Sequence, residues 1–224
     1  MSVLRVLWAV LVKDVQAELR TRQSLMAMVV FAALTVVVFN FAFPSVRAET
    51  VRIAPGVMWV AFAFAGVLGL NRSFALETEA GAVTALLASP ADRGAIYLGK
   101  MLANAAFIAV LQALVVPLFV VLYNLGRPAE TGRLVVILVL GAVAFSAAGT
   151  AFAGVAANTR MRDVMTPLLL FPAATPVLIA AVEGTGMALR GDEAGFGGAV
   201  RLLVGFTAAY TAAAYLLFEY VLEE

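Results

Sequence analysis

Six long stretches of the chain contain no charged residue, and every Asp, Glu, Lys and Arg lies between or around them. These stretches cover residues 23–46, 53–71, 101–126, 134–159, 164–182 and 202–218. A helix rises about 1.5 Å per residue, so about 20 apolar residues span a hydrocarbon core of about 30 Å. A charge at the centre of such a span costs about 2.5–3.5 kcal/mol on insertion scales. The pattern therefore predicts an all-α polytopic membrane protein with six transmembrane helices.

The predicted spans use most of the length of the chain. We place them at about residues 25–43, 53–70, 101–125, 134–157, 164–182 and 202–222. Their connections are short, so we expect a single transmembrane domain over residues 1–224. The first apolar run begins only near Ser24, after six charged residues, and we expect it to be retained as a span.

Residues 2–22 show the period of an amphipathic helix. Its apolar positions follow i, i+3, i+4, i+7 spacing and comprise Leu4, Leu7, Trp8, Leu11, Val12, Val15 and Leu19. Arg5, Lys13 and Arg20 fall elsewhere on the helix. We expect an elbow helix that lies in the membrane interface, with Trp8 and the basic side chains among the headgroups. The alternative is an ordinary solvated N-terminal helix.

Composition supports the membrane assignment and excludes several kinds of chemistry. Hydrophobic residues make up 63% of the chain, against about 45–50% in soluble proteins. The net charge of +1 offers no basic surface for nucleic acid. Because the chain contains neither Cys nor His, it has no thiol nucleophile, no imidazole base and no His ligand for zinc or haem. We expect no metal site.

Residues 94–101, Gly-Ala-Ile-Tyr-Leu-Gly-Lys-Met, nearly match the nucleotide-binding pattern G-x-x-x-x-G-K-[ST]. Met101 stands where a hydroxyl would hold Mg²⁺, and the segment precedes a membrane span instead of following a strand. We therefore expect no nucleotide site here. We interpret the segment as a loop whose Lys100 anchors the third span at the interface.

Three prolines, Pro167, Pro172 and Pro176, lie within the fifth predicted span. Each removes a backbone donor that lipid cannot replace. We expect this span to be kinked or broken, and buried against other helices.

Small residues recur at every fourth position of the fourth predicted span: Ala142, Ser146, Thr150 and Gly154. Small side chains let helix backbones approach closely in lipid. The row predicts close helix packing, either within the chain or across a dimer.

The distribution of Lys and Arg favours one orientation. Nine of these residues lie on the side of the N-terminus and six on the other side. Basic residues are enriched in cytoplasmic connections. We therefore expect both termini to lie in the cytoplasm.

The connection between the second and third spans, within residues 72–100, is patterned. Glu77 and Glu79 stand at the start of a predicted helix that runs to Leu87, near the positive end of its dipole. Ser89-Pro90 ends this helix. We interpret it as an element on which a partner docks. The alternative is an amphipathic connection that rests on the membrane.

Three groups of residues resemble a known family. They are Arg-Ile-Ala-Pro-Gly-Val-Met-Trp-Val at 52–60; Leu70-Asn-Arg72-Ser-Phe74 with Glu77, Gly81, Leu86-Leu87, Ser89-Pro90 and Gly99-Lys100; and Phe171-Pro172 with Pro176-Val-Leu-Ile. With six spans in 224 residues, the chain resembles the haem exporter protein B family, the permease subunit of the cytochrome c maturation ABC transporter.

This resemblance implies a type-2 ABC exporter fold in the bacterial inner membrane, with an elbow helix, six spans and a cytoplasmic coupling helix. ATP would be bound by a separate ABC ATPase subunit, and two permeases would pair with two ATPases. The residues placed in the contact with the ATPase are Arg72, Glu77, Glu79, Gly81, Val83, Leu86, Leu87, Ser89 and Pro90.

The resemblance also implies haem as cargo, or release of a haem-loaded chaperone, together with other maturation membrane subunits. If haem passes through this chain, only Met, Tyr or no side chain is left to ligate its iron. One alternative is a scaffold that transports nothing. Another is a secondary transporter or intramembrane enzyme, which the lack of a carboxylate or Lys within the spans disfavours.

Overall fold

The computed structural model describes residues 2–42, 47–79, 92–125, 130–157, 159 and 161–221. These residues form seven helices and no strand: α1 (Val3–Thr21), α2 (Gln23–Ala42), α3 (Arg47–Glu79), α5 (Arg93–Leu122), α6 (Thr131–Ala157), α7 (Arg162–Arg190) and α8 (Phe196–Val221). All except α1 contain a segment long and apolar enough to cross a membrane. The predicted all-α fold with six membrane-spanning helices is confirmed.

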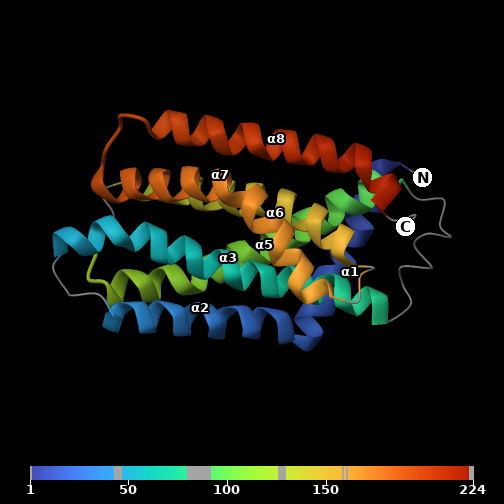
Figure 1. Cartoon of the computed structure of the whole chain (residues 1–224), viewed down its shortest axis with the longest axis horizontal. Helices are drawn as coiled ribbons and strands as arrows, with labels where there is room; N and C mark the ends of the chain where they lie inside the picture. Colours follow the sequence, from blue (N-terminus) through green and yellow to red (C-terminus); the bar gives the residue numbers. More distant parts are fainter. Residues whose placement is uncertain are drawn as a thin grey trace.

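The six long helices lie side by side, and α1 lies at one end of the bundle, where the described part of α8 ends (Figure 1). We call this the α1 end. Helices α3 and α6 are central, because 72% and 67% of the residues in their apolar 18-residue segments are buried. Helices α2 and α8 flank the bundle, and the corresponding buried shares are 17% and 11%. Because the outer surfaces of α2 and α8 are apolar yet exposed, these are surfaces suited to lipid.

The second span is longer than expected. Helix α3 begins at Arg47, contains Pro55 and continues to Glu79, whereas we expected a span over 53–70 followed by a separate helix. The prediction that Glu77 and Glu79 start a new helix is wrong, because both belong to the end of α3. Residues such as Ala75 and Leu76 favour helix, so the helix continues past the point where charged residues resume.

Helix α7 is continuous through Pro167, Pro172 and Pro176, so the fifth span is not broken. Figure 1 shows that α7 changes direction near its middle. A proline in a helix interior removes one hydrogen bond and clashes with the preceding turn, which bends the helix. Because of the bend, the first half of α7 packs against α3 at the α1 end.

Small residues let the central helices approach closely. The row in α6, Ala142, Ser146, Thr150 and Gly154, is buried within the chain. On the same helix, a Cβ at Gly141 would lie 2.1 Å from Cη2 of Trp59, a residue of α3. The indole Nε1 of Trp59 donates a hydrogen bond of 2.9 Å to Oγ1 of Thr185 in α7. A single indole therefore joins three helices.

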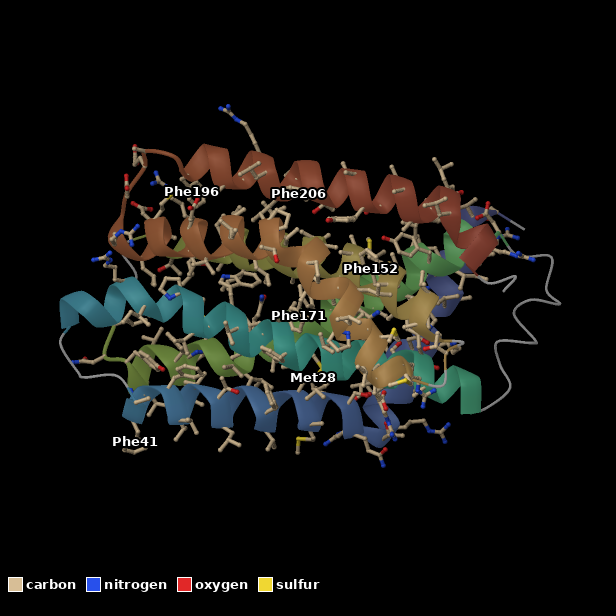
Figure 2. The ribbon with its side chains drawn as sticks, viewed as in Figure 1. Met28, Phe41, Phe152, Phe171, Phe196 and Phe206 are labelled. Carbon is tan, nitrogen blue, oxygen red and sulfur yellow. The ribbon has the colours of Figure 1, made fainter. Side chains whose placement is uncertain are left out.

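Helix α2 is held along its length by contacts on one side only. In Figure 2, Met28 points toward α3, whereas Phe41 points away from the bundle. A Cβ at Gly69 would lie 2.6 Å from the sulfur of Met28, so α2 and α3 are close there. At the far end, Nδ2 of Asn40 donates to the carbonyl of Leu122 at 2.8 Å. Phe41 is 86% exposed, as expected for a lipid-facing side chain.

Candidate functional site at the α1 end

Helix α1 packs closely on α5 through one glycine. A Cβ at Gly99 would lie 2.8 Å from both the carbonyl oxygen of Leu7 and Cβ of Val10. Val10 is buried against α5, whereas Leu4 and Trp8 on another face of α1 are 74% and 63% exposed. An exposed apolar face beside a bundle of membrane spans is what the elbow helix interpretation requires.

A buried ion pair strengthens this contact. Nζ of Lys100, in α5, lies 3.3 Å from Oδ2 of Asp14, in α1. The side chain of Lys100 is only 2% exposed, and its Nζ also lies 4.8 Å from the ring centroid of Phe74, in α3. Cations over aromatic rings are stabilised by the ring quadrupole. One ammonium group thus connects α1, α5 and α3.

The segment that resembles a nucleotide-binding loop is part of a helix. Residues 94–101 lie within α5, so the expectation of a loop is wrong. Its two glycines are explained by packing: Gly99 faces α1, and a Cβ at Gly94 would lie 2.4 Å from the ring of Tyr215 in α8. The packing role of these glycines is not evident from the sequence, because the helices that require them, α1 and α8, are far away in the chain.

A second carboxylate fastens α1 to α2. Oε1 of Glu18, a residue 7% exposed, accepts a hydrogen bond of 2.7 Å from the backbone N–H of Leu25 in the first turn of α2. Carboxylates at helix N-termini are favoured because the first N–H groups lack helical partners. Between the two helices Arg22 adopts φ 53, a left-handed turn. This cap is not predicted from the sequence, although Glu18 stands shortly before a charge-free span.

The residues assigned to the contact with the ATPase fall at the same end of the bundle. Arg72, near the end of α3, donates a hydrogen bond to Oε1 of Gln23 at the start of α2. Glu77 and Glu79 follow in the last turn of α3 that the structure describes. The remaining residues of that assignment lie outside the described residues: Gly81, Val83, Leu86, Leu87, Ser89 and Pro90.

Helix α5 starts at a well-capped position. Oδ1 of Asp92 accepts a hydrogen bond of 2.9 Å from the N–H of Ala95, and its Oδ2 lies 3.3 Å from the hydroxyl of Tyr215 in α8. The start of α5 is therefore tied to the last span. Together with Lys100, these contacts make α3, α5, α1 and α8 one connected group at the α1 end.

The described side chains at the α1 end are arranged for mechanical connection. Within the described part of the chain, no group of three or more His, Cys, Asp or Glu residues is placed to hold a metal ion. The charged groups that are buried, Lys100 and Glu18, are engaged in contacts between helices. These contacts join α1 to α2, α3 and α5.

Known proteins match this chain over most of its length. The sequence profile of the family described as "CcmB protein" matches residues 5–220. The chain belongs to the CcmB protein family. Membership confirms the family expected from the three groups of residues, and with six apolar helices it makes the chain an integral membrane protein.

Individual relatives of this CcmB chain carry the name "Heme exporter protein B". That of Rhodobacter capsulatus is 31% identical over 209 residues, 93% of each chain. That of Paracoccus denitrificans is 31% identical over 186 residues, covering 83% of this chain and 84% of the relative. That of Pseudomonas aeruginosa is 28% identical over 182 residues, 81% of each chain.

The elbow helix of this CcmB chain can be tested by fluorescence, because the chain has two tryptophans, Trp8 and Trp59. In a Trp59→Phe variant, the remaining Trp8 is expected to be quenched more strongly by lipids brominated near the headgroup than at the chain ends. In the matched Trp8→Phe variant, Trp59, which is 2% exposed, should resist both lipids. Equal resistance of both tryptophans would indicate a solvated α1.

Proposed function

We propose that this chain is the permease subunit of an ABC transporter in c-type cytochrome biogenesis, and that its transport system exports haem. The observation that carries the proposal is alignment along 93% of its length with a protein named "Heme exporter protein B". The six spans and the exposed apolar face of α1 agree with a permease role. We place it in the bacterial inner membrane with both termini in the cytoplasm, following the bias of Lys and Arg.

The mechanism in this proposal is mechanical. A separate ATPase subunit binds ATP and presses on the connection between α3 and α5, which includes Glu77 and Glu79. The movement passes into α3 and α5 directly, and into α1 through Asp14 and Lys100. Two permeases pair with two ATPases. Other maturation subunits and a haem chaperone then receive the exported haem.

The cargo in this proposal is handled without strong iron ligands. The chain has no His and no Cys, so Met or Tyr side chains are the ones left to approach a haem iron. We therefore treat haem as cargo and not as a resident cofactor. A second version, in which ATP hydrolysis moves a partner subunit so that a haem-loaded chaperone is released, fits the absence of His and Cys equally well.

The first experiment is to extract the tagged chain from native membranes in mild detergent and to identify what co-purifies by mass spectrometry. We expect an ABC ATPase in near-equal amount. An absorption spectrum of the same sample would show a haem band if the chain contacts haem directly. Partner proteins without any ATPase, across several detergents, would favour the scaffold alternative.

Glu77→Ala combined with Glu79→Ala is expected to reduce ATP-dependent cytochrome c maturation at least tenfold, because the loss of even one charged hydrogen bond across an interface costs about 1.5–3 kcal/mol and about 1.4 kcal/mol corresponds to a factor of ten. Membrane insertion should be unchanged. The matched control is Glu223→Ala with Glu224→Ala, which removes the same charge from the C-terminus. Normal maturation in the first double variant, with the ATPase still bound, would contradict the docking role of these carboxylates.

A further inference from the structure

A groove of about 480 Å³ opens between α2, α3 and α7, next to the bend of α7. One end of the groove includes Phe31 and Phe64, which are 37% and 47% exposed. Their ring centroids lie 6.3 Å apart. Its other end includes Arg72 and Arg162, at the ends of α3 and α7 that meet at the α1 end. Phe64 precedes Arg72 by eight residues, about 12 Å along the helix.

The groove is therefore amphipathic along its length, with aromatic rings toward the bilayer centre and guanidinium groups at the depth of the headgroups. Asp163 also lines it, so these three charged side chains sum to +1. Arg162 and Asp163 form an ion pair, with Nε of Arg162 4.0 Å from Oδ1 of Asp163. Guanidinium groups offer forked donors that suit phosphate oxygens.

The start of α7 adds to the positive charge of the groove. At the start of α7, Met161 provides no side-chain cap, so the first N–H groups of that helix add a partial positive charge beside Arg162.

We propose that this groove binds an anionic phospholipid from the leaflet at the α1 end. The phosphate lies between Arg72 and Arg162, and an acyl chain lies along Phe31 and Phe64. The lipid is favoured as occupant because the groove faces outward between spans, its charge is positive, and basic pockets between transmembrane helices recognise anionic headgroups. The site is independent of the haem role proposed above.

This site has a consequence for the permease. The lipid bridges the end of α3, which leads into segment 80–91, and the start of α7, which carries the bend. Because Arg72 also donates to Gln23, the bound headgroup would connect α2, α3 and α7 at one point. Occupancy of the groove would then stabilise one arrangement of these helices over another.

The test is native mass spectrometry of the detergent-extracted protein, with whatever subunits co-purify, titrated with phosphatidylglycerol or phosphatidylcholine of matched chains. We expect phosphatidylglycerol to be retained preferentially. Arg72→Gln with Arg162→Gln should lower its retention at least tenfold. Asp163→Asn, which removes the negative charge, should raise retention about threefold and keeps the test decisive if the first variant folds poorly.

The matched control is Arg20→Gln with Arg22→Gln, two exposed arginines at the same end that do not line the groove. This control should retain phosphatidylglycerol within twofold of the parent protein. Equal loss in both double variants would mean general charge attraction and would overturn the site. Equal retention of the two lipids by the parent protein would overturn the site as well. Unchanged retention of phosphatidylglycerol in the Arg72→Gln with Arg162→Gln variant would also overturn it. Displacement of phosphatidylglycerol by protoporphyrin, a dicarboxylate, at lower concentration than a second phospholipid would assign the groove to a different anion.

Discussion

Asp14→Leu is expected to lower the stability of the detergent-solubilised protein by about 3–5 kcal/mol, because it leaves the ammonium of Lys100 buried without its carboxylate. Lys100 is 2% exposed, and Oδ2 of Asp14 lies 3.3 Å from its Nζ. For a chain of this size the corresponding fall in melting temperature is about 6–20 °C. The measurement is a thermal melt followed by the fluorescence of Trp59, which lies in the centre of the bundle.

The reverse change, Lys100→Met, should be less harmful. Asp14 keeps Lys13, whose Nζ lies 3.2 Å from its Oδ1, and its side chain is 10% exposed, so its charge is better hydrated. The double variant Asp14→Leu with Lys100→Met should recover most of the loss, since an apolar pair replaces a buried ion pair at little cost. Additive losses in the double variant would show that the two side chains do not interact.

Gly141→Ala is expected to lower the melting temperature by about 2–12 °C, corresponding to about 1–3 kcal/mol of overpacking. The new methyl group would lie 2.1 Å from Cη2 of Trp59, where no side chain fits. The indole cannot rotate away freely because its Nε1 donates to Thr185. Differential scanning fluorimetry in detergent measures the change.

The control for Gly141 lies on the same helix. A Cβ at Gly132 would meet no atom within 4 Å. Because alanine is a better helix former than glycine by about 0.5–1 kcal/mol, Gly132→Ala should leave the melting temperature unchanged or raise it slightly. Opposite signs at two glycines of α6 would locate the close contact with α3. A loss of equal size at both positions would contradict it.

The membrane fold could be predicted from sequence because charge is costly in hydrocarbon, so each span appears as a run without charges. The same reasoning failed for the ends of α3. Charge-free runs mark where the bilayer begins and ends, whereas the helix is set by backbone hydrogen bonds and continues from Arg47 to Glu79. The bend of α7 was foreseen because proline acts locally, within one turn.

The contacts at the α1 end could not be predicted in the same way. Asp14 and Lys100 are 86 residues apart, and nothing in their local sequence distinguishes a buried pair from two surface charges. Lys100 was assigned to the interface because an isolated Lys is rarely buried. Gly99 likewise needs the backbone of α1 beside it to be understood. The groove joins Asn71, Arg72 and Arg162 through tertiary packing, and no sequence period links them.

The distance in sequence between Asp14 and Lys100 also sets an order of events during synthesis. A ribosome adding about 5–20 residues per second needs about 4–17 s to make the 86 residues between them. During that time α1 has no α5 on which to pack, and its contacts are those of Glu18 with the start of α2 and of the apolar face with Trp8 at the membrane surface. Helix α1 is thus made well before it can be fixed to α5. A nascent chain stalled before Lys100 should leave α1 open to protease, and one stalled well after it should protect α1.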